Sequence, residues 1–328
     1  MAIADDLQRR WYDPKATPPW WTLPVTAVFG CLSGLRRSMY RRGWLKSTRL
    51  PVPVIVVGNL GVGGTGKTPL TIALVEALRA HGFKPGVVSR GYGGTARVPT
   101  LLDAQPDPRV VGDEPALIRL RTGVPVAVGA ERPAAARLLL QQGVDVVIAD
   151  DGLQHYALAR DIEICVVDGA RRFGNARLLP AGPLREPLTR LHDVDFVVCN
   201  GGEPHAGEVS MQLAMGDAVA LSDPSRTRPL GDFKGERVHA VAGIGNPVRF
   251  FEALRAFGID VVAHPFADHQ SYKATDLAFG DDAPVLMTEK DAVKCRAFAA
   301  AHWWRVPVSA RLPEPFLDDV ASALARPQ

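Results

Sequence analysis

A glycine-rich segment that ends in a lysine and a threonine offers the clearest chemistry in this sequence. The run from Gly61 to Thr68 matches the pattern G-x-x-x-x-G-K-[ST] in full. In such a segment the backbone N–H groups turn toward nucleotide phosphates, the lysine reaches the β and γ oxygens, and the threonine hydroxyl ligates Mg²⁺. A strand-like run before it and a helical repeat after it favour a phosphate-binding loop over a chance turn. The residues expected to bind the nucleotide are Gly61, Gly63, Gly64, Thr65, Gly66, Lys67 and Thr68.

Two adjacent acids end a second hydrophobic run. In "VDVVIADDGLQH", Asp150 and Asp151 stand where a phosphate-loop protein places the carboxylate that orients its metal. Adjacent residues of an extended strand point in opposite directions, so both acids need not face the metal. An ordinary Asp-Gly turn is the alternative. Beside a complete phosphate loop, the sequence favours a magnesium site.

Further segments of the chain carry polar side chains that could belong to an active site. Asp113 and Glu114 precede a helical run, where a helix-capping role is the simple explanation. Asp268 and His269 could form a catalytic pair or a polar turn. The loops "SRGYGG" and "PAGPLREPLTRL" carry Arg90, Tyr92, Arg185 and Glu186. Their arginines could bind phosphate or simply be solvated.

The elements that must position these residues read as an α/β fold. Strand-like runs occur at Val52–Val57, Pro85–Ser89, Val144–Ala149, Ile162–Val167 and Val194–Cys199, with helical stretches between them. Continuous Val/Ile strands separated by helices indicate a doubly wound parallel sheet covered on both faces. After a segment rich in Gly, Pro and charge, a second βα series predicts a smaller α/β domain. We expect the segments 1–50, 51–205, 206–237 and 238–328 to be a membrane-associating N-terminus, a nucleotide-binding core, a linker or hairpin, and the smaller domain.

The first fifty residues differ from the rest in composition. They carry nine Lys or Arg, three acids and four of the six tryptophans, whereas the whole chain has a net charge of only +3. The apolar run "WWTLPVTAVFGCLSGL" would span about 24 Å as a helix, less than the roughly 30 Å of a bilayer core. Its tryptophan and arginine flanks favour an interfacial helix on anionic lipid over a firm span, with a buried amphipathic helix as the alternative. A basic footprint for nucleic acid is absent from the body of the sequence.

Several segments together resemble one family, the tetraacyldisaccharide 4′-kinases of lipid A biosynthesis. In order along the chain they are "GNLGVGGTGKTP", "SRGYGG", "GDEPALI", "ADDGLQH", "RDIEICVVD", "PAGPLREP", "GIGNPVRFF", "PFADHQSY" and "TEKDAVKC". One departure is Gln270, because the family often has Asp-His-His where this chain has Asp-His-Gln. The resemblance implies a phosphate-loop fold and a membrane-associating N-terminal helix.

The same resemblance implies an activity and a place in the cell. The enzyme would use ATP and Mg²⁺ to phosphorylate the 4′-hydroxyl of a tetraacylated glucosamine disaccharide 1-phosphate. This would take place at the cytoplasmic face of the inner membrane of a Gram-negative bacterium. Neither a nucleic acid nor an obligate protein partner is expected.

The resemblance also assigns roles to residues. It makes Asp113 the catalytic carboxylate and His269 its partner, with Asp268 beside them and Lys67 on the phosphates. It gives the metal to Thr68 and to Asp151 or Asp150, with Asp151 preferred. Residues implied at further positions of the active site are Tyr92, Glu114, Arg132, His155, Arg185 and Glu186.

Other functions remain open on the sequence. A phosphate-loop NTPase could act as a regulator or metallochaperone, or the chain could bind nucleotide without chemistry of its own. A guanine-specific switch is disfavoured, because "TEKD" places its lysine next to the aspartate and so departs from the N/T-K-x-D spacing. A serine hydrolase is disfavoured by the lack of a G-x-S-x-G elbow.

Overall fold

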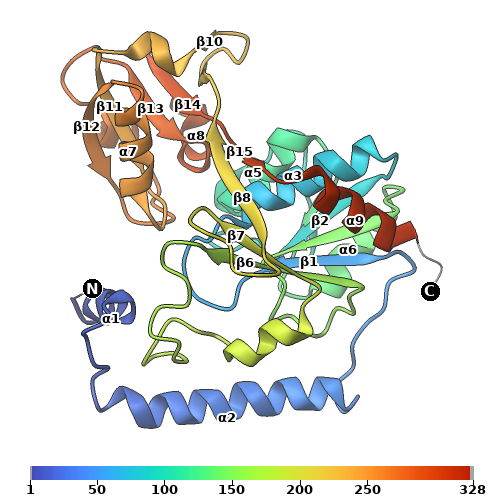
Figure 1. Ribbon diagram of the computed structural model, residues 1–328. Helices are drawn as coiled ribbons and strands as arrows, with labels where there is room; N and C mark the ends of the chain where they lie inside the picture. The colour runs from blue at the N-terminus through green and yellow to red at the C-terminus, as the bar shows by residue number, and fades with distance from the viewer. Residues whose placement is uncertain (1, 326–328) are drawn as a thin grey trace.

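The computed structural model describes residues 2–325, which form two β-sheets and the helices that cover them (Figure 1). One sheet has nine strands in the order β15-β8-β7-β6-β1-β5-β2-β4-β3, and the other has six in the order β10-β9-β14-β13-β11-β12. We call the first sheet with its helices the large unit and the second the small unit. The α/β class expected from the sequence is confirmed.

Most strands of the large sheet run parallel. They are β1 (Val54–Gly58), β2 (Pro85–Ser89), β3 (Thr100–Leu101), β4 (Val126–Val128), β5 (Val146–Asp150), β6 (Ile162–Asp168), β7 (Phe196–Asn200), β8 (Val209–Met215) and β15 (Val308–Arg311). Only β3 on β4 and β15 on β8 pair antiparallel. All five predicted strands occur within one to two residues of their expected bounds.

Helices cover both faces of the large sheet. They are α3 (Lys67–Ala80), α4 (Pro108–Val111), α5 (Asp113–Thr122), α6 (Arg132–Leu140) and α9 (Glu314–Ala325), with the 3₁₀ helix η1 (Leu188–Asp193). Side chains alternate along a strand, so Ile55 of β1 packs with α3, α5 and α9, whereas Val56 packs with α6 and the loops that follow β5. This burial on both faces explains the uninterrupted hydrophobic strands.

The small unit also combines a β-sheet with helices. Its strands are β9 (Ala218–Ala220), β10 (Thr227–Arg228), β11 (Arg237–Ala242), β12 (Asp260–Pro265), β13 (Val285–Thr288) and β14 (Trp303–Val306). Its helices are α7 (Pro247–Ala256) and α8 (Glu289–Cys295), with the 3₁₀ helices η2 (Leu230–Phe233), η3 (Ala274–Leu277) and η4 (Arg296–Phe298). Phe233, Phe251 and Leu254 fill its core.

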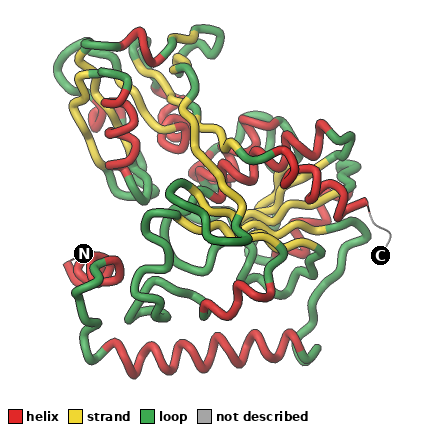
Figure 2. The backbone as a smooth tube through the Cα atoms, in the orientation of Figure 1, coloured by secondary structure: helices red, strands yellow, loops and turns green. Residues whose placement is uncertain are grey.

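The chain crosses between the units twice, side by side. It leaves the large sheet through β8 and returns through β15, and these two strands pair with each other, Met215 opposite Val308 (Figure 2). The expected linker of 206–237 therefore contains strands of both sheets. The expected unit of 238–328 also differs from the structure at its end, because β15 and α9 pack on α3 of the large unit. Phe316 and Val320 of α9 are buried there, which makes the return favourable.

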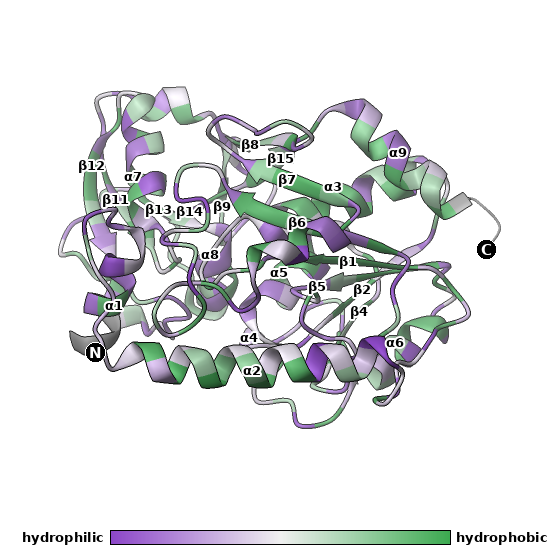
Figure 3. Cartoon of the chain, turned by 60° about the horizontal axis from the view of Figure 1, so that its bottom comes forward, coloured by the Kyte–Doolittle hydropathy of each residue, from purple (hydrophilic) through white to green (hydrophobic). Residues whose placement is uncertain are grey.

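Two helices precede the first strand. They are α1 (Ala2–Tyr12) and α2 (Thr22–Arg41), and α2 runs along one side of the large unit as a single long helix (Figure 3). The hydroxyl of Thr26 accepts a hydrogen bond from the N–H of Ala181 (3.0 Å), and Gly30 lies so close to Leu178 that an added Cβ would be 3.0 Å from its Cδ1. Within residues 2–325, no helix is long and apolar enough to cross a membrane.

Candidate active site

The glycine-rich segment forms the turn between β1 and α3. Gly66 has φ +95°, a left-handed conformation that glycine adopts without strain, and α3 begins at Lys67 with Thr68 second. The side-chain amide of Asn200 donates to the carbonyl of Thr65 (2.9 Å), and Arg171 donates to the carbonyl of Gly64 (2.8 Å). The turn is thus held from outside while its N–H groups and the helix N-terminus remain available to an anion.

Lys67 lies between an amide and a carboxylate. Its Nζ is 3.4 Å from Oδ1 of Asn59 and 3.5 Å from Oδ1 of Asp151. Asn59 is buried at the end of β1, so the side chain of Lys67 is held along the strand edge. A lysine in this place supplies positive charge to the phosphate-binding turn.

The two acids after β5 have different environments. Asp150 is buried, and its Oδ1 accepts from the hydroxyl of Thr71 (3.0 Å). Burial, with Glu114 and Asp151 nearby, raises the pKa of Asp150 to about 7. Burial also acts against ionisation of Asp151, but Lys67, Arg185 and Arg132 outweigh it and lower the pKa of Asp151. Asp151 is therefore the charged acid at this edge of the sheet.

Two arginines predicted for the site lie beside Asp151. Arg185 donates to its carboxylate at 3.5 Å, and Arg132 donates to its backbone carbonyl at 2.6 Å. Arg132 is only 4% exposed, its Nη1 has no hydrogen-bond partner among the described residues, and burial lowers its pKa to about 10. A buried guanidinium with a free N–H is suited to an anionic ligand.

His155 and Glu186 lie behind these residues. Burial, followed by Arg132 and Arg160, lowers the pKa of His155 to about 4, so its ring is neutral at physiological pH. Glu186 is buried and accepts hydrogen bonds from Gln154 (3.1 Å) and from the hydroxyl of Tyr156. Because both of its oxygens have partners, Glu186 supports the surrounding loops.

A second cluster lies where the two units meet. Asp113 begins α5 of the large unit, and His269 belongs to the loop after β12 of the small unit. Nδ1 of His269 is 3.0 Å from Oδ1 of Asp113, and the ring of Tyr92 contacts His269 edge-on with centroids 4.9 Å apart. Oδ2 of Asp113 is buried and has no hydrogen-bond partner among the described residues.

The pKa values of this pair reflect their contact. Burial raises the pKa of Asp113, but the hydrogen bond from His269 and the charge of Lys290 more than offset this, so the net shift is downward. The hydrogen bond to Asp113 raises the pKa of His269, opposed by burial and by Lys290. The carboxylate is thus ionised and keeps one oxygen free to accept a proton.

The second cluster lies beside the phosphate-binding turn. A Cβ added to Gly245, in the loop after β11, would be 3.1 Å from the backbone nitrogen of Gly64 and 4.0 Å from Oδ2 of Asp268. Glycine is thus required where the small unit approaches the turn, and Asp268 lies at the same point. Glu114 belongs to the second cluster through Lys290, 3.1 Å from its Oε1, and its charge is one cause of the raised pKa of Asp150.

Comparison with known proteins shows the family of the chain. The family model described as tetraacyldisaccharide-1-P 4′-kinase matches residues 19–325. The chain belongs to this family.

Named members of the tetraacyldisaccharide-1-P 4′-kinase family are similar over nearly the whole chain. A tetraacyldisaccharide 4′-kinase of Stenotrophomonas maltophilia is 55% identical over 317 residues, covering 93% of each chain. One of Xanthomonas euvesicatoria is 54% identical over 325 residues, covering 93% of this chain and 92% of the relative. A crystal structure of LpxK from Aquifex aeolicus in complex with ATP has a TM-score of 0.77 at 28% identity, covering 92% of this chain and 96% of that one.

Sequence reasoning missed two lysines at the centre of the cluster formed by Asp113 and His269. Lys290 and Lys294 of α8 lie 3.9 and 3.8 Å from Oδ2 of Asp113. Both belong to "TEKDAVKC", which contributed only to the family resemblance and to excluding a guanine switch. Their spacing of four on a short helix puts both on one face, and that was the available signal.

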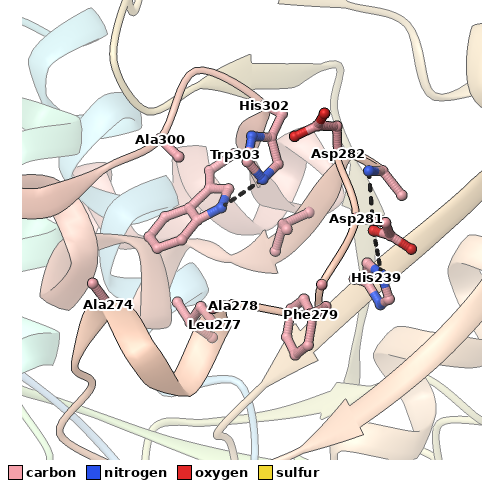
Figure 4. A pocket seen from close by; sticks show the side chains of 13 residues that line it. His239, Ala274, Leu277, Ala278, Phe279, Asp281, Asp282, Ala300, His302 and Trp303 are labelled. Atoms are coloured by element: carbon pink, nitrogen blue, oxygen red, sulfur yellow. Dashed lines mark hydrogen bonds and ion pairs between the residues drawn. The ribbon is translucent and has the colours of Figure 1, made fainter.

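A separate hollow of about 380 Å³ lies in the small unit (Figure 4). It is lined by His239, Asp281, His302 and Trp303 among others, and His239 is held between His264 (2.9 Å) and Asp281 (3.0 Å). None of the predicted site residues lines this hollow. In the described part of the chain, no group of three or more His, Cys, Asp or Glu side chains is arranged to hold a metal.

Proposed function

We propose that this chain is an ATP-dependent kinase that phosphorylates the 4′-hydroxyl of a tetraacylated glucosamine disaccharide 1-phosphate in lipid A biosynthesis. Its membership of the kinase family and the ATP complex of a structural relative support this assignment. The observation that carries the chemistry is Asp113, a buried carboxylate at the junction of the units whose Oδ2 has no hydrogen-bond partner among the described residues, with Lys294 and Lys290 at 3.8 and 3.9 Å. A kinase needs such a group to accept the proton of the attacking hydroxyl.

The proposed reaction is an in-line transfer. The 4′-oxygen attacks the γ-phosphorus while Oδ2 of Asp113 accepts its proton. The bond from the γ-phosphorus to the bridging oxygen breaks, and its electron pair remains on the ADP that leaves. His269 holds Asp113 by donating from Nδ1 to Oδ1, and Lys67 offsets charge on the phosphates.

Magnesium suits the acids beside Lys67. The hydroxyl of Thr68 and the carboxylates of Asp151 or Asp150 are oxygen donors of the kind that Mg²⁺ prefers, with few protein ligands and the phosphates completing its shell. When bound, the ion would neutralise charge on the β and γ oxygens. Asp151 is the better candidate, because its carboxylate is ionised and one-third exposed, whereas Asp150 is buried against Thr71.

The remaining predicted residues would support binding. Arg132 and Arg185 bring positive charge to Asp151 and to any phosphate bound there. Tyr92 packs on His269, and Glu114 and Asp268 hold the cluster at the junction of the units. His155 and Glu186 would keep the loops after β5 in place.

We place the enzyme on the cytoplasmic face of the inner membrane, attached through α2. The outer side of this helix exposes Val25, Val28, Leu32 and Leu35, which share one face by their spacing. Trp20, 81% exposed, lies just before the helix, and basic residues follow it. An apolar face bordered by tryptophan and arginine fits the interface of an anionic bilayer.

A phosphoryl-transfer assay tests the proposal. Purified protein is incubated with γ-labelled ATP, Mg²⁺ and the tetraacyl disaccharide 1-phosphate in detergent. The label should appear on the lipid, and ATP consumption should depend on the lipid. ATP hydrolysis at the same rate without lipid would instead support the regulator or metallochaperone alternative.

A further inference from the structure

Lys290 lies beside the proposed catalytic pair, Asp113 and His269, and its ammonium group makes three close polar contacts. It is the second residue of α8, and its side chain is only 15% exposed. Its Nζ lies 3.1 Å from Oε1 of Glu114, 3.1 Å from Oδ1 of Asp268 and 3.3 Å from Nε2 of His269. One ammonium group therefore contacts three side chains from two segments of the chain, α5 and the loop after β12.

These contacts cross the junction between the units. Glu114 belongs to α5 of the large unit, whereas Lys290, Asp268 and His269 belong to the small unit. A second ionic contact fixes α8 in the same place: the buried carboxylate of Glu289 accepts from Arg121 of α5 at 2.5 Å. Because its neighbour is anchored, the backbone of Lys290 cannot move away without breaking that pair.

We propose that Lys290 is a positioning residue for the Asp113–His269 pair, favouring the ring form of His269 that leaves Nε2 unprotonated and donates from Nδ1 to Asp113. This proposal rests on the proposed kinase function, in which Asp113 accepts the proton of the substrate hydroxyl. Lys290 donates no hydrogen bond to the proton-accepting Oδ2 of Asp113, from which its Nζ is 3.9 Å away.

The hydrogen-bond chemistry of the three groups supports the assignment. A lysine ammonium can only donate, so Nε2 of His269 must accept from Lys290 and carry no proton. The ring proton then resides on Nδ1, which faces Oδ1 of Asp113 at 3.0 Å. A doubly protonated ring would bring an N–H and a positive charge against the ammonium, which disfavours that form.

Lys290 contacts His269 at 3.3 Å, whereas Lys290 and Lys294 lie at similar distances from Oδ2 of Asp113, 3.9 and 3.8 Å. His269 is faced by Asp113, Asp268, Lys290 and the ring of Tyr92. Asp113 is faced in addition by Glu114, which follows it on α5, and by Lys294 at 3.8 Å, whose nearer partner is Asp291 at 2.9 Å. Burial alone would lower the pKa of Lys290, but Glu114, Asp113 and Asp268 raise it, so the ammonium persists.

The test compares Lys290→Met, which removes the charge but keeps the length, with wild type and with Lys290→Arg. Lys290→Met should lower kcat by roughly 10–10²-fold through misplacement of the pair, while the Kd for ATP stays unchanged. Without the cation, the pKa values of Asp113 and His269 both rise. The acid limb of the pH–rate profile should therefore move to higher pH by roughly one unit. Lys290→Arg should keep the limb near its wild-type position, because the positive charge is retained.

A second measurement requires no substrate. A pH titration of ¹⁵N-histidine-labelled protein, with His269→Gln to assign the signal, should show the Nδ1–H form of His269 in wild type. The midpoint for this ring should be higher in Lys290→Met. Lys234→Met, at an exposed lysine of the small unit, is the matched control and should change neither the kinetics nor the titration.

The outcomes separate this proposal from the proposed function. If wild type phosphorylates the lipid but Lys290→Met leaves both the acid limb and the His269 titration unchanged, the positioning role is wrong. The same holds if the only effects of Lys290→Met are a lower Tm and weaker ATP binding, as for a purely structural residue. If wild type does not phosphorylate the lipid, the kinase function fails, while the titration still decides the role of Lys290.

Discussion

Nδ1 of His269 and Oδ1 of Asp113 are 3.0 Å apart although the two residues belong to different units of the fold. Asp113 is fixed at the start of α5, and His269 reaches it from the loop after β12, with φ +61°. The pair therefore exists only while the two units are docked. The activity of the proposed catalytic base should therefore depend both on the ionisation of Asp113 and on the docking of the two units.

Replacing Asp113 by asparagine should remove the base while preserving its shape. We expect kcat to fall by ~10²–10⁴-fold, because the proton of the sugar hydroxyl loses its acceptor. The nucleotide should bind as before, since the polar contacts of Asp113 within residues 2–325 are to Glu114, His269, Lys290 and Lys294 and not to the phosphate-binding turn. Steady-state kinetics with saturating lipid and a nucleotide-binding titration measure the two effects.

The matched control for Asp113→Asn is Asp107→Asn, at the N-cap of the short helix α4 that precedes α5. Asp107 accepts from the backbone N–H of Arg109 and pairs with its guanidinium, so its substitution affects only this exposed local contact. This control should keep wild-type kcat. A large loss of nucleotide affinity in Asp113→Asn would assign Asp113 a structural role instead.

The fold was largely predictable because its strongest signals are local. Uninterrupted runs such as Val54–Gly58 can satisfy their burial only inside a covered parallel sheet, and the predicted strand Pro85–Ser89 matches its observed bounds. The double crossing was not predictable in the same way. β8 and β15 are almost a hundred residues apart, and their pairing depends on how the small unit sits between them, which no local pattern encodes.

The site was predictable only where a motif carries its own chemistry. Lys67 and Thr68 follow from the glycine pattern, whereas Asp113 alone looked like a helix-capping residue and was assigned through the family resemblance. In the structure the N-cap of α5 is Gly112 and Asp113 is the first residue of the helix, so the capping explanation was wrong, although Oδ1 of Asp113 accepts from the adjacent N–H of Glu114. The role of Lys290 depends on contacts across the junction, which the spacing of residues along the chain does not reveal.

Asp151 and Asp150 should differ in their effect on the metal. Asp151→Asn should raise the Mg²⁺ concentration for half-maximal activity by at least about tenfold, because an ionised oxygen ligand is lost. Asp150→Asn should change it less, since Asp150 is buried against Thr71. Mg²⁺ titrations of both variants at fixed ATP measure this, and a larger effect for Asp150→Asn would reverse the assignment of the two acids.

The stability of the nucleotide-free protein should depend on pH through the ionisation of Asp150. Its pKa is about 7 in the folded protein and roughly 3.9 when unfolded, so the folded state binds a proton that the unfolded state releases. The neutral carboxyl therefore favours folding most at low pH, and this contribution is lost as pH rises through about 7. Asp150→Asn cannot ionise and avoids that loss.

The expected result is a Tm difference between Asp150→Asn and wild type that grows in favour of the variant from pH 5 to pH 8. The amide oxygen of the asparagine can still accept from Thr71, so this hydrogen bond need not change. Thermal unfolding without Mg²⁺ or nucleotide measures the difference. Asp260→Asn, at an exposed position of β12, should show no such trend. A Tm difference independent of pH would mean that Asp150 is ionised in the fold throughout this range.

The apolar side of α2 should govern attachment to lipid. The triple substitution of Val28, Leu32 and Leu35 by serine removes exposed apolar side chains and leaves the inner contacts of Thr26 and Gly30 intact. Each of these side chains is worth roughly 1.5 kcal/mol or more when buried, so binding to anionic vesicles should fall by at least ~10²-fold in a sedimentation assay.

Val248→Ser, which removes an equally exposed apolar side chain from α7, should sediment like wild type. Because the inner face of α2 still packs on the large unit, phosphorylation of lipid in detergent should persist in the triple variant. Unchanged sedimentation would show that α2 is a structural helix of the large unit rather than the membrane anchor.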